Sequence, residues 1–103
     1  MDTIKEQTTA TLEFAFYDEN DAAVIPDSGS FQLYDKFSGT AIRNGSITGL
    51  AATMDFDLTT TDNTLLDQTA RYEIRVLEVE YIYSTKTGRG LYEYKVENLS
   101  YLT

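Results

Sequence analysis

Carboxylates are the side chains of this sequence that could carry out chemistry, because the chain contains no His and no Cys. Without His the commonest general base is absent, and without Cys there is no thiolate nucleophile, disulfide or cysteine zinc site. Asp55 and Asp57 share one face of a predicted strand, and Glu78 and Glu80 share a face of another. Paired carboxylates hydrolyse glycosidic bonds in many enzymes. Both pairs fall on the polar side of alternating strands, where charged residues are expected without a catalytic role. We therefore predict no catalytic residue and a protein that is not an enzyme.

Two other segments resemble parts of ligand-binding loops. Asp18-Glu19-Asn20-Asp21, followed by Asp27, offers the hard oxygen ligands that calcium prefers. The spacing lacks the central Gly and terminal Glu of an EF-hand, and acidic residues are also good turn formers, so a plain turn is favoured over the calcium alternative. Gly88-Arg89-Gly90 is similar to a fragment of a phosphate loop, but no helix pattern follows it. We expect neither a metal site nor a cofactor site.

The tyrosines form the most informative pattern in the chain, since six of the eight lie between Tyr72 and Tyr101. If Thr87 and Gly88 form a two-residue turn, the flanking strands place large residues opposite one another on one side of a hairpin. The predicted pairs are Tyr83 with Tyr92, Tyr81 with Tyr94, and Val79 with Val96. A slip of one residue would break this face, so the pattern favours this register.

Tyrosine has a large apolar body and a polar tip, which makes it common at protein interfaces. The residues that we predict to form an interface are Tyr81, Tyr83, Tyr92, Tyr94 and Tyr101. The alternative is that the tyrosines fill the edge of a core with their hydroxyls at its rim, as we expect for Tyr72. The apolar phase shifts by one residue at Val76-Leu77, which predicts a β-bulge and favours the interface.

Hydrophobic and polar residues alternate along almost the whole chain, which is typical of half-buried strands. The predicted strands cover residues 11–17, 30–36, 51–58, 71–84 and 91–97, with a short strand or edge at 24–25. Asn44-Gly45 favours a type I′ turn that would set Ile42 opposite Ile47. Residues 59–70 break the alternation, and we expect one short helical turn near 61–67 that places Leu65 and Leu66 beneath the sheets.

About seven short strands with turn signals about every ten residues predict an all-β fold, an antiparallel immunoglobulin-like β-sandwich. The length of 103 residues suits a single domain that spans residues 1–103. We expect residues 1–8 to form a flexible N-terminal arm.

The net charge of −9 is spread evenly over the chain. No basic stripe is present to neutralise phosphates, so we predict no binding to nucleic acid or to an anionic membrane surface. Residues 1–7 are polar and lack the apolar core of a signal peptide, and no apolar run approaches the length of a membrane span. The acids favour solubility, with complementarity to a basic partner surface as the alternative.

Three stretches of the chain resemble a known group of proteins. They are residues 9–18, where a strand runs into an acidic turn, residues 30–35, and residues 58–76, where a threonine-rich turn with a Leu pair leads into a long strand. In this layout the chain resembles the small β-sandwich structural proteins of tailed bacteriophages, which include capsid decoration (cement) proteins and head–tail neck components. The resemblance implies a virion protein that is assembled in the host cytoplasm.

The predicted function is that of a non-enzymatic virion structural protein, a capsid decoration protein first and a head–tail connector or tail-attachment component second. The expected partners are other virion proteins, the major capsid protein or the portal and neck proteins, and further copies of the chain in a homo-oligomer. An alternative from another class is an immunoglobulin-like adhesive or carbohydrate-binding module, whose aromatic side chains would stack on sugar rings.

Overall fold

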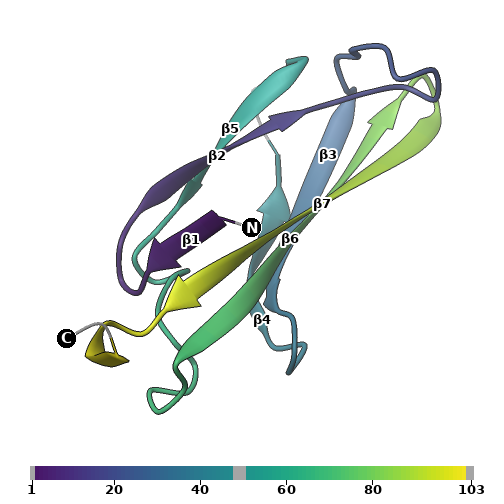
Figure 1. The fold of residues 1–103 in the computed structure, drawn as a ribbon. Coiled ribbons are helices and arrows are strands. Elements are labelled where there is room, and N and C mark those ends of the chain that lie inside the picture. Colours follow the sequence, from purple (N-terminus) through teal and green to yellow (C-terminus); the bar gives the residue numbers. More distant parts are fainter. Residues whose placement is uncertain (1, 48–50, 102–103) are drawn as a thin grey trace.

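The computed structural model describes residues 2–47 and 51–101 and shows a sandwich of two β-sheets (Figure 1). The strands are β1 (Asp2–Lys5), β2 (Ala10–Ala15), β3 (Ser28–Asp35), β4 (Ala41–Ser46), β5 (Thr53–Leu58), β6 (Tyr72–Tyr83) and β7 (Lys86–Glu97). A short 3₁₀-helix, Leu99–Tyr101, follows β7. Over the described residues no helix has the length and apolar character needed to cross a membrane.

The larger sheet has five strands in the order β1-β7-β6-β3-β4, and β2 pairs with β5 in the smaller sheet. Neighbouring strands run antiparallel except for β1 and β7, which run parallel. The long strands β6 and β7 extend along the length of the sandwich (Figure 1). This arrangement confirms the predicted all-β immunoglobulin-like sandwich.

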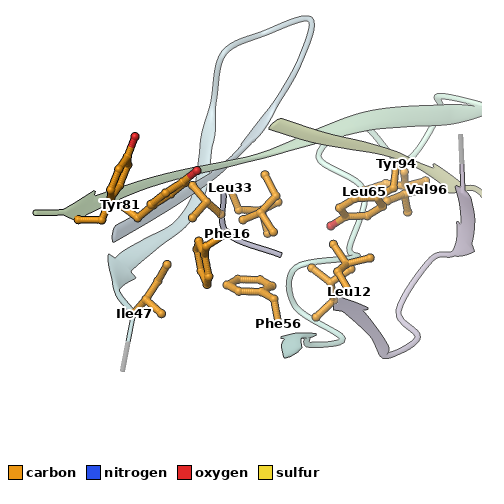
Figure 2. Close-up of a cluster of buried hydrophobic side chains, with 13 residues drawn as sticks. Leu12, Phe16, Leu33, Ile47, Phe56, Leu65, Tyr81, Tyr94 and Val96 are labelled. Carbon is orange, nitrogen blue, oxygen red and sulfur yellow. The ribbon is translucent and has the colours of Figure 1, made fainter. Parts of the chain in front are cut away.

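The core lies between the sheets and follows from the alternation seen in the sequence. In β5, Phe56 and Leu58 are buried, whereas the residues that alternate with them, Asp55 and Asp57, are exposed. Figure 2 shows Leu12 and Phe56 of the smaller sheet on one side of the core, with Leu33 and Tyr94 of the larger sheet on the other. Removing these apolar side chains from water is the main favourable contribution to folding.

The β6–β7 hairpin turns at a different place from the one predicted. Tyr83 pairs with Lys86 and Tyr81 pairs with Gly88, so the two-residue turn is Ser84-Thr85 and not Thr87-Gly88. Ser84 and Thr85 both have positive φ angles, 47° and 65°, as a type I′ turn requires. The predicted pairing of tyrosines with tyrosines across the hairpin is therefore wrong.

Asn44-Gly45 lies within β4 and does not form the predicted turn. In the β3–β4 pair Asn44 stands opposite Gln32, and Gly45 stands opposite Phe31. A Cβ atom on Gly45 would lie 3.3 Å from the Phe31 ring, so glycine leaves room for this aromatic side chain. Ile42 is consequently a residue of β4 and does not face Ile47 across a turn.

Strand β6 pairs with β3 and β7 without a register shift, so no bulge occurs at Val76-Leu77. Ile74 and Val76 are buried, although they point to the face opposite Leu77 and Val79. The register shift of the larger sheet lies instead at Leu33/Tyr34, between β3 and β4. Tyr72 falls in the outward phase and is 45% exposed, which corrects its predicted place in the core.

Two shorter segments also differ from the predictions. Residues 60–63 form a turn and no helix lies within 61–67, although Leu65 is buried as expected and Leu66 is exposed. Residues 2–5, which were expected to belong to a flexible arm, form β1 at the edge of the larger sheet. The parallel pairing with β7 supplies the hydrogen bonds that hold this segment.

Candidate interaction surface

One end of the sandwich carries an open hollow of about 470 Å³ between the β3–β4 turn and the loop that precedes β6. Both loops lie at the lower end of the molecule in Figure 1. Phe37, Leu66 and Tyr72 line the hollow, with exposed fractions of 75%, 50% and 45%. We call these three residues the end patch. Exposed large apolar side chains gathered at one place are typical of contact sites between proteins.

Asp35 ends β3 and shapes the turn that carries Phe37. Its Oδ2 atom accepts hydrogen bonds from the Ser38 N–H at 2.9 Å and from the Ser38 hydroxyl at 2.8 Å. Its backbone carbonyl accepts a hydrogen bond from the Gly39 N–H at 2.8 Å, and Gly39 adopts a φ of 73° that suits glycine. These bonds fix the turn and keep Phe37 exposed to solvent.

Arg75 of β6 joins the two loops from inside the protein. Its side chain is fully buried, and Nη1 donates to Asp35 Oδ1 at 2.9 Å. Nη2 lies 2.8 Å from Glu73 Oε1 and donates to the Thr64 carbonyl at 3.0 Å. A buried charge is costly unless it is paired and hydrogen-bonded. These contacts provide partners for Nη1 and Nη2, whereas the buried Nε has no hydrogen-bond partner among the described residues.

Glu73 fixes the second loop of the hollow. Its two carboxylate oxygens accept hydrogen bonds from the backbone N–H groups of Leu66 and Asp67, both at 2.9 Å. Farther along the loop, the buried Asn98 side chain donates to the carbonyls of Gln68 at 2.9 Å and Ala70 at 2.8 Å. A loop held in this way loses little conformational freedom when a partner covers it.

Charged side chains surround the end patch. The Lys95 ammonium lies 4.7 Å from the centre of the Tyr72 ring, and Lys36 lies 3.0 Å from Glu93 in an ion pair. The Thr69 hydroxyl, and after it the Thr69 N–H, lowers the pKa of Asp67 by donating hydrogen bonds to its carboxylate. The patch is thus an apolar centre with a polar rim, the arrangement found at many interfaces.

The carboxylate pairs weighed from the sequence do not converge. Asp55 and Asp57 are exposed on the outer face of the smaller sheet. Glu78 and Glu80 lie on the outer face of the larger sheet, within 3.6 Å and 2.9 Å of the Arg89 guanidinium. The two pairs therefore face away from each other and line no common cleft.

The acidic turn and the glycine-flanked arginine both belong to regular local structure. Asp18 Oδ1 accepts hydrogen bonds from the N–H groups of Asn20 at 2.8 Å and Ala22 at 3.0 Å, which closes the turn on itself. Within residues 2–47 and 51–101 no group of three acidic side chains is placed to hold a metal ion. Gly88-Arg89-Gly90 belongs to β7 and continues as a strand, unlike a phosphate loop.

No protein-family model and no curated protein matches the chain. A solved structure to which the chain is similar is that of a strand-swapped dimer of the immunoglobulin-like domain of mouse leukocyte-associated immunoglobulin-like receptor 1. The two share 14% identity over 91% of this chain and 84% of that chain, with a TM-score of 0.45.

The tyrosines predicted to form an interface lie mostly in the core. Tyr81 and Tyr83 are each 8% exposed, and Tyr94 is fully buried. The Tyr94 hydroxyl donates to Asn63 Oδ1 at 3.0 Å, and the Tyr81 hydroxyl donates to the Tyr17 carbonyl at 2.7 Å. These three side chains offer no surface to a partner in this fold, so the core-edge alternative describes them and the candidate surface lies elsewhere.

The other two predicted tyrosines differ from this group. Tyr92 is half-buried, and its hydroxyl donates to the Asp2 carboxylate. Burial first, and then this hydrogen bond, raises the pKa of Tyr92 to about 12. Tyr101 ends the 3₁₀-helix, and its side chain lies outside the described residues.

Sequence reasoning did not single out the end patch. Phe37 stands in a polar turn between Asp35 and Gly39, where a large apolar residue has no core to fill. Such a residue is a signal that could have been used, because turns are otherwise rich in small and polar residues. Leu66 carried no such signal. Its neighbour Leu65 is buried, and the sequence alone does not show which of the two leucines is exposed.

Proposed function

We propose that this chain is a non-enzymatic structural protein that binds another protein through the end patch. The observation that carries the proposal is the gathering of Phe37, Leu66 and Tyr72 around one hollow, on loops that the buried Arg75 holds in place. Rigid, exposed aromatic side chains make good anchors because little conformational entropy is lost when they are covered.

The proposed partner is a component of a phage head, and the proposed position is on the capsid as a decoration protein. The sequence layout supports this choice through its resemblance to small β-sandwich proteins of tailed phages. A small contact such as the end patch gains strength when many copies bind a symmetric particle, and a homo-oligomer would gain in the same way. A place at the head–tail neck is the alternative within this class.

Binding to capsids assembled without this protein tests the proposal. The variant Phe37→Ser with Leu66→Ser removes two exposed apolar side chains and leaves the buried core intact. Fully covering a side chain of this size contributes about 1.5–3 kcal/mol. Because Phe37 is 75% exposed and Leu66 is 50% exposed, covering both contributes about 2–4 kcal/mol, and the variant should bind about 100-fold more weakly in a co-sedimentation assay. Leu91→Ser is the matched control, because Leu91 is 66% exposed on the outer face of β7, away from the patch.

The result that would overturn the assignment is equal binding by the patch variant and the unmodified protein. Circular dichroism of each variant shows whether the sandwich is retained, so loss of binding is separated from loss of fold. Light scattering of the protein alone and mixed with portal or neck proteins distinguishes the decoration role from the neck alternative.

An adhesive or carbohydrate-binding module is the second candidate, and one observation favours it. The outer face of β3 and β4 carries a hollow of about 380 Å³ lined by Gln32, Tyr34, Asn44 and Glu78, among others. Amide and carboxylate groups beside a tyrosine ring suit the hydroxyls and apolar faces of a sugar. Binding to a glycan array that is lost on Gln32→Ala with Asn44→Ala, and kept in the end-patch variant, would favour this function.

A further inference from the structure

Strand β1 is attached to the rest of the fold along one edge. It is four residues long and pairs with β7 from Asp2 opposite Tyr94 to Lys5 opposite Glu97. Ile4 is its half-buried residue and packs against the core, while Asp2, Thr3 and Lys5 are exposed. In Figure 1 the strand lies beside β7 and leads through a tight turn into β2 in the other sheet. Few side chains therefore hold β1 in place.

The turn after β1 contains a strained backbone at Gln7. Its φ angle is 57°, in the left-handed region that non-glycine residues rarely adopt. The Gln7 side chain is exposed, so its packing gives no reason for this conformation. Strain of this kind persists only where the surrounding contacts impose it.

The contacts on the two sides of Gln7 belong to different parts of the fold. On the β1 side, the Glu6 N–H donates to the Glu97 carbonyl at 2.9 Å, and the Glu6 carboxylate accepts from the Leu99 N–H at 3.0 Å. On the β2 side, the Asn63 side-chain amide donates to the Thr8 carbonyl at 2.6 Å. The chain is thus clamped to the end of β7 before Gln7 and to the β5–β6 loop after it.

We propose that two copies of this chain exchange β1, so that the β1 of each copy pairs with β7 of the other. If Gln7 takes an extended conformation, β1 leaves its own β7 and can form the same parallel ladder on a second copy. The contacts of β1 with β7, and of Glu6 with Leu99, are then all re-formed across the dimer. The left-handed φ angle is relieved at each hinge. In return, the Gln7 N–H exchanges its hydrogen bond to the Asn63 carbonyl, 2.8 Å long, for one to water, and the exposed Thr8 hydroxyl does the same with its bond to the Lys5 carbonyl, 2.6 Å long. Short hinges under strain favour exchange of this kind.

Substitutions at Gln7 test the hinge in opposite directions. Gln7→Gly accepts the left-handed conformation and favours the closed monomer by about fivefold at each hinge, so the dimer should dissociate about 25-fold more readily. Gln7→Val keeps the N–H group but disfavours that conformation still more, so the dimer should be tighter than in the unmodified protein. Light scattering over a range of protein concentrations measures both changes.

Asp21→Val is the matched control for strain alone. Asp21 has a similar φ angle of 60° and lies in the turn that follows β2, away from the hinge. This variant should lower the midpoint of unfolding and leave the proportion of dimer unchanged. If Asp21→Val increases the proportion of dimer as much as Gln7→Val does, general destabilisation of the fold causes the association.

A cysteine pair shows which β7 each β1 occupies. Thr3 stands opposite Lys95 in the parallel ladder, and the chain has no Cys of its own, so Thr3→Cys with Lys95→Cys introduces one possible disulfide. Oxidation with glutathione disulfide should give covalent dimers from the dimer fraction and internally bridged monomers from the monomer fraction. The share of covalent dimer should fall when Gln7→Gly is added.

The proposal is overturned if the dimer fraction yields internally bridged chains, because β1 then stays on its own β7. It is also overturned if the protein and its Gln7→Val variant remain monomeric at the highest soluble concentration. Neither outcome bears on the end patch, whose binding to another protein is measured separately.

Discussion

Gly88→Ala is the substitution that tests the register of the β6–β7 hairpin most directly. Gly88 stands opposite Tyr81, and a Cβ atom on it would lie 2.4 Å from Cζ and 2.6 Å from the hydroxyl oxygen of the Tyr81 ring. The ring has little room to move, because it packs edge-on against Phe16 with centroids 4.9 Å apart. Its hydroxyl also donates to the Tyr17 carbonyl at 2.7 Å.

The expected loss of stability follows from these contacts. The ring must retreat from 2.4 Å to an ordinary contact of about 3.4 Å, and overpacking of this kind costs about 1–3 kcal/mol. The displaced hydroxyl gives up its hydrogen bond to Tyr17, which adds about 1 kcal/mol. Replacing glycine by alanine within a strand stabilises the fold by about 0.5–1 kcal/mol, because alanine loses less conformational entropy on folding. The net destabilisation is about 1–3.5 kcal/mol.

Gly90→Ala provides the matched control, since Gly90 lies in the same strand and on the same face. Its Cβ atom would lie 3.3 Å from the half-buried Phe14 ring, so a shift of a few tenths of an ångström suffices. This variant should be within about 0.5 kcal/mol of the unmodified protein or slightly more stable. Urea unfolding followed by circular dichroism measures both variants. Equal stability of the two would show that the Tyr81 ring does not cover Gly88, and the register would be wrong.

Four further predictions concern the turn, the core and the buried charges. Thr85→Gly should raise the unfolding free energy by about 1 kcal/mol, because glycine adopts a positive φ without strain; no gain in urea unfolding would contradict the turn. Tyr81→Ser with Tyr94→Ser should unfold the domain, since each loss costs about 3–5 kcal/mol; a folded double variant, seen by circular dichroism, would contradict their core role. Arg75→Met should cost about 3–5 kcal/mol by leaving buried carboxylates unpaired, whereas a cost near zero in urea would show that they rearrange. The raised pKa of Tyr92 means that its contribution to stability is complete below pH 10 and is lost as the pH rises to about 12, which urea titrations over that interval and the Asp2→Asn variant would check.

The faces of the strands could be predicted from the sequence, and the pairing of the strands could not. The predicted partner of Tyr83 was Tyr92, and the observed partner is Lys86, six residues away. Side chains alternate between the two faces of a strand with a period of two residues. A shift of six residues, an even number, therefore changed the partner of every residue but not the face on which its side chain lies. Tyr81, Tyr83 and Tyr94 therefore share one face, as predicted, but they do not face one another, and that face is the inner one and not an interface.

The turns were misplaced because glycine has two uses in a β-protein. Asn44-Gly45 and Thr87-Gly88 carry the residues that favour tight turns, yet both glycines lie within strands beneath an aromatic ring. The observed turn at Ser84-Thr85 contains residues that resist a positive φ. Room for the Phe31 and Tyr81 rings is a property of the packed sandwich, which local sequence does not reveal.

The end patch could not be predicted because its support comes from distant parts of the chain. In the sequence Arg75 looks like an ordinary charged residue of an alternating strand. Its burial depends on Asp35, forty residues away, and on the loop at Thr64. No local pattern indicates that these groups meet. The sequence placed the candidate interface on the tyrosines because the number of tyrosines can be counted in a sequence. The long-range contacts that hold a loop in place cannot be recognised there.

The buried charges at this end of the sandwich are better explained by the loops that they hold in place than by a contribution to stability. A complete ion-pair network removed from water is often no more stabilising than apolar residues of the same size, although removal of Arg75 alone leaves its buried carboxylates unpaired. Its partners hold the backbone on both sides of the hollow: Asp35 shapes the turn of Phe37, and Glu73 binds the N–H group of Leu66. A network that costs desolvation and fixes two loops is useful where the side chains on those loops must meet a partner in one conformation. The end patch is the place in the described structure where that requirement and exposed apolar side chains coincide.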